Sequence, residues 1–411
     1  MKTKVIRIHN PMAALPAFWF KGIEAYSTRA MVCPNGITIV ADCKNPQLLK
    51  ESHQYLRELG LGPQELIIVK TPENGDLYQA IIDESNVAEI VDLVTTQGYK
   101  IEFFCTRSNI ESNFLSRLGL KWTDVVSLPS NLADKWNNKA ELREKIGKEN
   151  GLNHLFPDYC IVNNKKELLK EFEKMLKRYK RVVIKPPLWA SGLGMICGDN
   201  ISIAQRYILQ YRDFPVGTII ERFLANHVAM SIVTRFENGQ IIDRWFTEQK
   251  CCQNDSSITY NGFIIGNTPR VTKMDEKWME DATLPFYDII CKECPSLTGI
   301  INFDCLRAGN ERFILECNAR VTFSTYIQEI RKVLGYDKTY LVSRVNPRVK
   351  SFKELTNLLD NLLLKDSKQP GGIIPFGIGC LQSAGYCYFI AVAEKYTSAM
   401  GLITRARLKI E

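Results

Sequence analysis

Apolar positions in the first quarter of the chain follow two periods. Short runs rich in β-branched residues predict strands, and longer stretches with apolar residues every three or four positions predict helices. The expected strands are Lys4–Ile8, Ile37–Ala41, Leu66–Lys70 and Lys100–Thr106, and the expected helices are Pro46–Leu59 and Asn86–Gly98. Strands that alternate with helices at this spacing predict an α/β domain with an open, mostly parallel sheet.

A second alternation of strands and helices begins at Asp134. The expected helices are Asp134–Glu149, Lys165–Tyr179 and Ser202–Tyr211, and the expected strands are Asp158–Val162, Arg181–Lys185, Met195–Cys197 and Gly217–Leu224. Asn137 or Asn138 is the expected cap of the first of these helices, and Gly151 is expected to end it.

Further along, two apolar runs flank a Gly-Asn turn and predict a β-hairpin, Gly299–Phe303 and Arg312–Leu315. Asp304 is expected to close the first strand and to lie opposite the Glu316 end of the second. Glu316 and Asn318 share one face because side chains alternate along a strand. Three oxygen-bearing side chains would then converge, as hard Mg²⁺ requires. The alternative is an amphipathic hairpin whose polar residues face water.

Lys185 ends a predicted strand and is followed by the sequence Ser191-Gly192-Leu193-Gly194. A glycine-containing loop between strands lets backbone N–H groups approach a polyphosphate, and a neighbouring lysine neutralises phosphate charge. The P-loop pattern is absent. The alternative is a plain hairpin loop.

The predicted strand that contains Glu221 has a less regular end. The backbone at such an end can offer a carbonyl and an N–H to the edge of an adenine ring. Phe223 and Leu224 would pack nearby, and Glu221 would accept a hydrogen bond from the exocyclic amine. The alternative is an edge strand on which Glu221 faces solvent.

Two positively charged side chains can each be interpreted in two ways. Arg29, inside a mostly apolar predicted helix, is either a surface side chain or an anchor for a carboxylate or phosphate. Lys250, in the loop expected after a strand at Gln240–Phe246, either reaches the phosphates of a ligand or is solvated.

The last eighty residues predict a helix, a glycine-punctuated apolar segment, a second helix and a final strand, at Ser351–Leu364, Gly371–Gly379, Gly385–Met400 and Gly401–Ile410. This region is either a packing appendage or a wall over the substrate site.

Composition restricts the function classes. The 411 residues are 45% hydrophobic and 24% charged, and the net charge of +8 is scattered, which does not favour nucleic-acid binding. No signal peptide or membrane span is expected, and the thirteen cysteines are read as reduced thiols, so a cytoplasmic location is expected. The pair Cys291 and Cys294 lacks the second ligand pair of a zinc site.

Six elements, taken in order, resemble the ATP-grasp superfamily, whose members bind ATP between two α+β lobes. They are Lys139, Lys185, the Ser191–Gly194 loop, Glu221–Leu224, Asp304 and Glu316–Arg320. The resemblance covers residues 135–320, and the preceding third resembles a pre-ATP-grasp domain. It implies a pre-ATP-grasp domain (1–134), a first lobe (135–215), a second lobe with the metal site (216–330) and a C-terminal extension (331–411).

The resemblance also implies roles for individual residues. Those for the phosphates are Lys139, Lys185, Ser191, Gly192 and Gly194. Those for the adenine are Glu221, Phe223 and Leu224. The ribose is assigned to His227, with Asn226 as the alternative. Those for one or two Mg²⁺ ions, for which Mn²⁺ can substitute, are Asp304, Glu316 and Asn318. The catalytic cations are Arg320, for the acyl substrate, and Lys250.

Three positions depart from the family pattern. The ribose acid is missing from the Ala225–Val228 region, Asn302 stands where D-alanine ligases have arginine, and Ala319 replaces the proline of an Asn-Pro-Arg sequence. These departures argue against D-alanine ligase and biotin carboxylase relatives. The pre-domain and the Gln249–Pro269 layout look more like peptide ligases of the pheganomycin type.

The implied activity is ATP-dependent ligation of a carboxylate to an amine or peptide through an acyl-phosphate, releasing ADP and phosphate. The alternatives are an ATP-grasp enzyme that stops at phosphorylation or uses a non-amine acceptor, and a nucleotide-binding protein without turnover. The expected partners are small molecules, with neither nucleic acid nor membrane, and a homodimer is compatible with the sequence.

Overall fold

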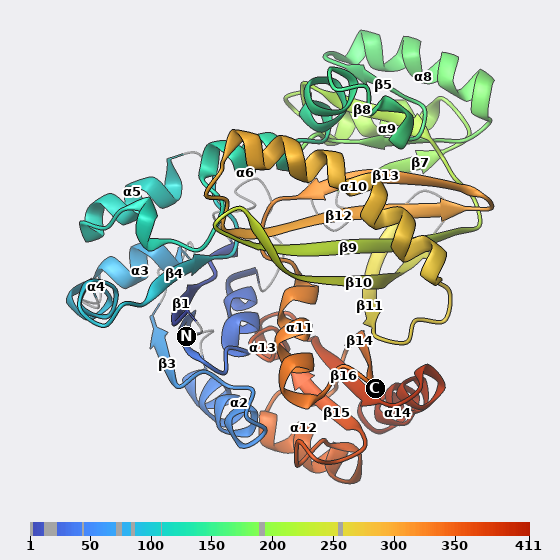
Figure 1. Cartoon of the computed structure of the whole chain (residues 1–411). Coiled ribbons are helices and arrows are strands. Elements are labelled where there is room, and N and C mark those ends of the chain that lie inside the picture. The colour runs from blue at the N-terminus through green and yellow to red at the C-terminus, as the bar shows by residue number, and fades with distance from the viewer. Residues whose placement is uncertain are drawn as a thin grey trace.

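A computed structural model describes residues 3–11, 23–42, 45–70, 76–83, 87–107, 109–188, 194–253 and 258–411. Within these ranges the strands form three sheets, of four, eight and four strands (Figure 1). None of the described helices is both long enough and apolar enough to cross a membrane.

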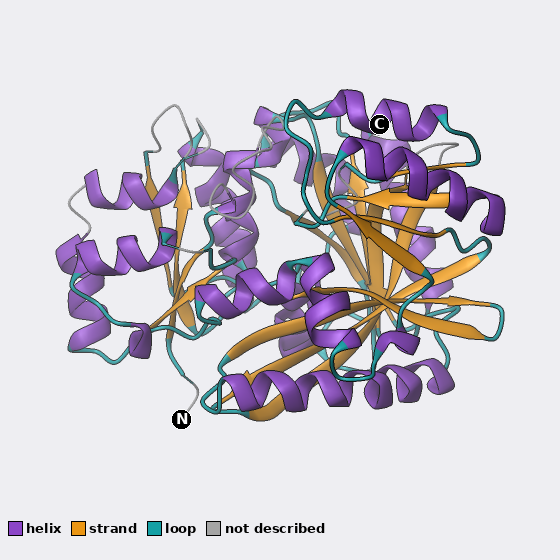
Figure 2. Ribbon diagram, turned by 90° about the horizontal axis from the view of Figure 1, so that it is seen from above, coloured by secondary structure: helices purple, strands orange, loops and turns teal. Residues whose placement is uncertain are grey.

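The N-terminal sheet is parallel, as the sequence predicts, with the strand order β3-β2-β1-β4. Its strands are β1 (Val5–Ile8), β2 (Gly36–Ala41), β3 (Glu65–Val69) and β4 (Lys100–Phe103). Its helices are η1 (Ile23–Met31), α2 (Pro46–Glu58), α3 (Leu77–Asp83), α4 (Val87–Thr95), α5 (Ile110–Leu118) and the short η2 (Trp122–Asp124). Figure 2 shows this sheet standing beside the large sheet, with helices on both of its sides.

The helix expected over Asp134–Glu149 is divided in the structure. It consists of α6 (Ser130–Asn137), the short α7 (Lys139–Glu141) and the π-helical turn η3 (Leu142–Lys148), and η4 (Asn153–Leu155) follows. Asn138 is extended at ψ 112°, and its side chain accepts hydrogen bonds from the amides of Ala140 and Glu141. The expectation of one continuous helix is wrong because this residue both ends α6 and caps the next turn.

The second four-stranded sheet is antiparallel, in the order β5-β8-β6-β7. Its strands are β5 (Tyr159–Val162), β6 (Val182–Lys185), β7 (Ile196–Gly198) and β8 (Thr218–Arg222), and its helices are α8 (Lys165–Tyr179) and α9 (Ser202–Gln210). Leu168, Phe172 and Tyr207 of the helices are buried with Ile184 and Ile220 of the strands. The order of these strands and helices along the chain is the one that the sequence predicts.

The large sheet is antiparallel throughout, in the order β13-β12-β9-β10-β11-β14-β16-β15. Its strands are β9 (His227–Glu237), β10 (Gln240–Gln253), β11 (Ile258–Ile265), β12 (Gly299–Ala308), β13 (Glu311–Asn318), β14 (Thr339–Val345), β15 (Gly372–Phe376) and β16 (Cys387–Ala393). Its helices are α10 (Lys273–Glu293), α11 (Phe323–Leu334), α12 (Phe352–Leu359), η5 (Asp360–Leu362), α13 (Cys380–Ser383) and α14 (Tyr396–Ile410). The C-terminal strands therefore extend the same sheet that carries the predicted metal hairpin.

Two C-terminal expectations are wrong. The helix expected at Gly385–Met400 is strand β16 followed by the start of α14, and the strand expected at Gly401–Ile410 is the rest of α14. Strand β16 reads as a continuous apolar run because β14 and β15 flank it and every residue in it is buried.

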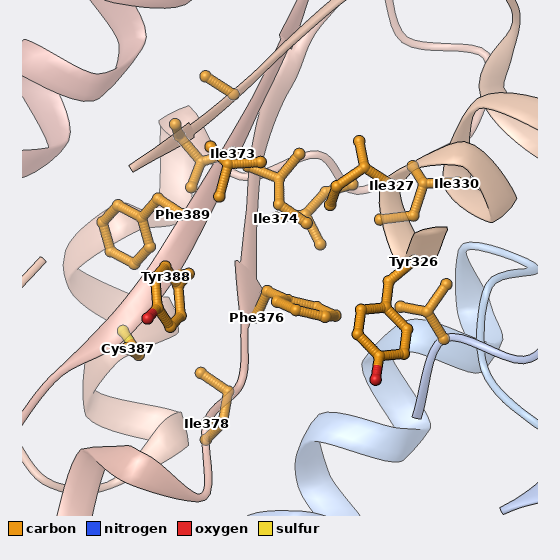
Figure 3. Close-up of a cluster of buried hydrophobic side chains, with 14 of the residues drawn as sticks. Tyr326, Ile327, Ile330, Ile373, Ile374, Phe376, Ile378, Cys387, Tyr388 and Phe389 are labelled. Carbon is orange, nitrogen blue, oxygen red and sulfur yellow. The ribbon is translucent and has the colours of Figure 1, made fainter. Parts of the chain in front are cut away.

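The largest apolar core joins the N-terminal helices to the C-terminal strands. Leu48 and Leu49 of α2 belong to the same buried cluster as Tyr326 of α11 and Phe376 of β15. Figure 3 shows the ring of Phe376 on β15 directed toward Tyr326 of α11, with Tyr388 on the neighbouring strand β16. The C-terminal region is therefore part of the main core.

Candidate active site

A cavity of about 650 Å³ opens where the first lobe, the large sheet and the N-terminal domain meet. The residues that sequence reasoning had singled out and that line it are Arg29, Lys139, Lys185, Glu221, Phe223, Leu224, His227, Asp304, Glu316, Asn318 and Arg320. Ser191 and Gly192 lie outside the described residues. Gly194 is described, with φ +66°, but it does not line the cavity.

The hairpin β12–β13 carries the expected oxygen ligands in the expected register. Asp304 pairs directly with Glu316, and Asn302 pairs with Asn318, so these side chains gather at one end of the hairpin. Asp304 does not close its strand, because β12 continues to Ala308 after a bulge between Asp304 and Cys305. Such a bulge re-aims neighbouring side chains.

Asp304 is held by three amides. Its carboxylate accepts from Gln249 at 2.7 Å, from Asn302 at 3.0 Å and from Asn318 at 2.9 Å. Burial and the charge of Glu316 raise the pKa of Asp304, since two buried carboxylates at close range resist ionising together. Burial also acts to raise the pKa of Glu316, but Lys139, whose Nζ lies 3.0 Å from its carboxylate, the hydrogen bond with Asp304 and the charge of Lys185 together lower it.

This arrangement fits a divalent cation. Asp304 and Glu316 offer carboxylate oxygens, and the amide of Asn318, which now donates to Asp304 at 2.9 Å and to Glu316 at 3.5 Å, offers a third oxygen when turned over. Within the described ranges, no group of three or more His, Cys, Asp or Glu side chains is placed to hold a metal. The candidate metal site therefore needs the side-chain amide of Asn318 as its third ligand.

The two predicted nucleotide lysines come from different elements and reach the same cavity. Lys139 opens α7, and its amide donates to the carbonyl of Pro187, which ties it to the end of β6. Lys185, the last residue of β6, contacts the carboxylate of Glu221. Burial lowers the pKa of Lys185, and Glu221 opposes that effect.

The solvent-facing interpretation of Glu221 is wrong. It is 2% exposed on β8, between β5 and β6, and lines the cavity. Its carboxylate contacts both Lys185 and Arg143, the latter at 2.6 Å, and its hydrogen bond to the adenine amine stays a prediction. Lys185 and Arg143 lower its pKa against the raising effect of burial.

Sequence reasoning missed Arg143. It is fully buried and donates to Glu221, to the Lys139 carbonyl and to the Leu315 carbonyl of β13. It thereby connects the four-stranded sheet that contains β8 to the β12–β13 hairpin. The only signal in the sequence was an arginine four residues after Lys139, which also suits an exposed helical face.

The expected adenosine residues form one end of the cavity. His227 Nδ1 lies 2.8 Å from the Leu224 carbonyl, and the Phe223 ring receives the guanidinium of Arg181 at 4.4 Å. A carbonyl only accepts, so Nδ1 of His227 carries the hydrogen, which leaves Nε2 of the neutral ring as an acceptor. Asn226, the alternative, is exposed and does not line the cavity.

Arg320 donates to Asn318 Oδ1 at 2.6 Å, beside the candidate metal ligands. The residue before it, Ala319, donates its amide to Asn137 Oδ1 at 2.9 Å. Proline has no amide hydrogen, so this bond requires the departure from Asn-Pro-Arg that the sequence shows.

Lys250 is placed differently from the expectation. It lies inside β10, opposite Gly262 of β11, and not in a loop. Its Nζ contacts the Met400 sulfur at 3.4 Å and lies 5.8 Å from the Tyr396 ring, whereas Gln249 and Cys251 on either side line the cavity. Alternation along the strand directs Lys250 to α14.

Comparisons with known proteins identify the fold. No family model matches the sequence, and no curated protein matches it. Among solved structures, N5-carboxyaminoimidazole ribonucleotide synthetase from Thermus thermophilus is similar at 12% identity, with a TM-score of 0.58 and 99% of each chain covered. A biotin carboxylase from Campylobacter jejuni in complex with an ATP analogue is similar at 11% identity, with a TM-score of 0.61, over 100% of this chain and 91% of its own.

A third similar structure is a carboxyaminoimidazole ribonucleotide synthase from Aspergillus clavatus with bound ATP, at 9% identity and a TM-score of 0.58, with 99% of each chain covered. The chain thus shares the fold of these ATP-grasp enzymes over almost its whole length, the expected N-terminal α/β part included. The sequence departures had argued against biotin carboxylase relatives, yet a biotin carboxylase is among the chains with this fold.

Proposed function

We propose that this protein is an ATP-dependent carboxylate–amine ligase that acts through an acyl-phosphate. The observation that carries the proposal is one cavity in which Asp304 and Glu316 face Lys139 and Lys185. Phosphoryl transfer depends mainly on positioning and on cations that neutralise developing charge. Two lysines and a pair of metal-binding acids supply that environment.

The nucleotide would bind with its adenosine against Phe223, Leu224 and His227. Nε2 of His227, as an acceptor, suits a ribose hydroxyl, the role left open by the missing acid. Lys139 and Lys185 would meet the phosphates. Lys139 now pairs with Glu316, and Lys185 with Glu221, so each lysine already lies within reach of the cavity.

Asp304, Glu316 and Asn318 would hold Mg²⁺, with Mn²⁺ as a substitute, and the bound cation would neutralise phosphate charge. Arg320, beside Asn318, would orient the substrate carboxylate. A carboxylate oxygen attacks the γ-phosphorus and ADP leaves. The amine nitrogen then attacks the acyl carbon, phosphate leaves, and the nitrogen releases a proton. Arg320 is suited to stabilise the oxyanion of that second step.

The test is a turnover screen of candidate acids, each with and without candidate amines, in Mg²⁺ and ATP. ADP that appears only when both are present, together with a condensed product in the mass spectrum, supports the ligase. ADP without a condensed product favours an enzyme that phosphorylates or uses a non-amine acceptor. Tight ATP binding without turnover favours a nucleotide-binding protein.

The matched variants are Glu316→Ala, which removes a candidate metal ligand, and Glu311→Ala, on the same strand but outside the cavity. Glu316→Ala should abolish ADP release, whereas Glu311→Ala should leave it unchanged. Undiminished ATP consumption by Glu316→Ala would contradict the metal assignment.

A further inference from the structure

A second wall of the same cavity has a different chemistry. Its residues come from η1, α11, β16 and the segment before β16, and they are Tyr26, Arg29, Phe323, Tyr386 and Tyr388. The Arg29 guanidinium carbon lies 3.8 Å from the centre of the Tyr26 ring, 4.6 Å from that of Phe323 and 4.9 Å from that of Tyr388. Arg29 is therefore enclosed by aromatic faces and is not the surface side chain that one sequence interpretation allowed.

Arg29 has no carboxylate partner among the described residues. Its one hydrogen bond there runs from Nη2 to the Tyr388 hydroxyl at 2.9 Å, and its Nε is buried without an acceptor. Arg344 of β14 repeats the arrangement beside it. Its guanidinium carbon lies 3.9 Å from the centre of the Tyr386 ring, and Tyr386 donates to the Tyr26 hydroxyl at 2.7 Å.

The described acids that line the cavity are all engaged elsewhere. Asp134 lies 3.5 Å from Arg107, and Glu221 holds Lys185 and Arg143. Asp304 and Glu316 form the candidate metal pair. The aromatic wall therefore presents positive charge without a described counter-ion.

An aromatic ring attracts a cation, but it does not use the directed N–H donors of a guanidinium. Those donors match the two oxygens of a carboxylate or phosphate. We infer that the wall around Arg29 and Arg344 binds an oxyanion that a substrate keeps through the reaction, separate from the carboxylate activated beside Asp304 and Glu316. This inference rests on the ligase function proposed above.

The side chains that line the cavity between the wall around Arg29 and the pair Asp304 and Glu316 indicate the class of substrate. Tyr260, Phe263 and Phe323 line the cavity, and the centre of the Phe263 ring lies 6.4 Å from that of Tyr260 and 5.4 Å from that of Phe323. Because Arg29 lies over Phe323, these aromatic side chains lead along the cavity wall away from Arg29. The substrate that spans them has an apolar or aromatic body with a reactive group at one end and an oxyanion at the other. It is either a dicarboxylic acid or an amine that carries its own carboxylate.

Matched probes test this with the full chain in Mg²⁺ and ADP. Phenylsuccinate and 3-phenylpropionate differ by one carboxylate, as do phenylalanine and 2-phenylethylamine. Isothermal titration should show that the carboxylate-rich member of at least one pair binds more tightly, by about tenfold for a charge-assisted pair of hydrogen bonds. The pair that discriminates identifies whether the acid or the amine carries the oxyanion.

Arg29→Gln should abolish this preference and leave ADP affinity unchanged, while Arg29→Lys should keep part of it. Arg344→Gln, at an exposed position, should weaken it without affecting folding. Arg331→Gln is the control, because Arg331 also lies over a tyrosine, Tyr336, but outside the cavity. The inference would be overturned if the two members of each pair bound equally, or if no probe bound at all. It would also be overturned if the preference for the carboxylate survived both Arg29→Gln and Arg344→Gln. If the unmodified chain did not bind ADP, that result would instead count against the proposed function.

Discussion

The amide of Ala319 donates to the side-chain oxygen of Asn137 across 182 residues of sequence. Asn137 ends α6, two residues before Lys139, and Ala319 follows Asn318, a candidate metal ligand. One hydrogen bond therefore fixes the end of α6 against the end of the β12–β13 hairpin, which carries the candidate metal ligands. The Asn137 amide also reaches back to the Ala319 carbonyl at 3.5 Å.

A double-mutant cycle tests this bond. Ala319→Pro removes the donor and Asn137→Ala removes the acceptor, and each should cost about 1–3 kcal/mol of unfolding free energy, the usual penalty for an unpaired buried group. The double variant should cost little more than the worse single one, because both lose the same interaction. Urea unfolding gives the three values. Fully additive losses would contradict the link.

The buried charge cluster around Glu221 should be sensitive to the loss of one member. Arg143→Met leaves Glu221 short of a buried counter-charge and should cost about 3–5 kcal/mol of unfolding free energy. The control is Arg222→Met, which breaks the half-exposed pair with Glu311 and should cost about 0–1 kcal/mol. Similar losses in both variants would count against the special burial of Arg143.

Lys250 and Lys185 should behave differently. Lys185→Met should lose most nucleotide affinity and turnover, because its ammonium lies in the cavity. Lys250→Met should keep turnover within about twofold of the unmodified chain, because the described contacts that it loses, to the Met400 sulfur and to the Tyr396 ring, both lie on α14. Nucleotide titration and ADP release measure both. A collapse of turnover in Lys250→Met would restore the catalytic role expected from the sequence.

His9 predicts a pH dependence of stability. It is buried, with Nδ1 2.7 Å from the Tyr326 hydroxyl and Nε2 3.3 Å from Glu102, and burial lowers its pKa below 6.5 against the effect of Glu102. Below pH 6.5 the unfolded chain binds a proton that the folded chain refuses, so stability should fall as the pH drops from 6.5.

His9→Gln should flatten this part of the curve, measured as unfolding free energy between pH 7.5 and pH 5.5, about one unit either side of the ordinary histidine pKa. His154→Gln, at an exposed position, is the control. An unchanged slope in His9→Gln would assign the pH dependence to other groups.

Periodicity predicted the parts of the fold where one local pattern dominates. The four N-terminal strands were found because helices cover their sheet and leave short, separate apolar runs. The sequence predicted a helix where β16 lies and a strand where most of α14 lies. Because β16 is buried on both faces, it lacks the alternation of apolar and polar residues that identifies a strand. Gly401 inside α14 also resembled a helix end, although Ala399, Ile403, Ala406 and Ile410 follow a helical spacing on its buried side.

The site was predictable where the residues of one function are close in sequence. Asp304, Glu316 and Asn318 lie on one hairpin, so a turn and the alternation of side chains were enough to bring them together. The partners of Glu221 were not predictable, because Arg143 reaches it from another element 78 residues away. The same holds for Arg29 and Tyr388, which meet across 359 residues.

The order of strands in the large sheet has a consequence for synthesis of the chain. Strand β11 pairs on one side with β10 and on the other with β14, which follows it by more than seventy residues, and β14 pairs in turn with β16. Until those segments leave the ribosome, β11 presents an open apolar edge to other nascent chains. We therefore expect chains that stop before β14 to be captured by chaperones or to aggregate, even though every residue of the candidate metal site has already been made.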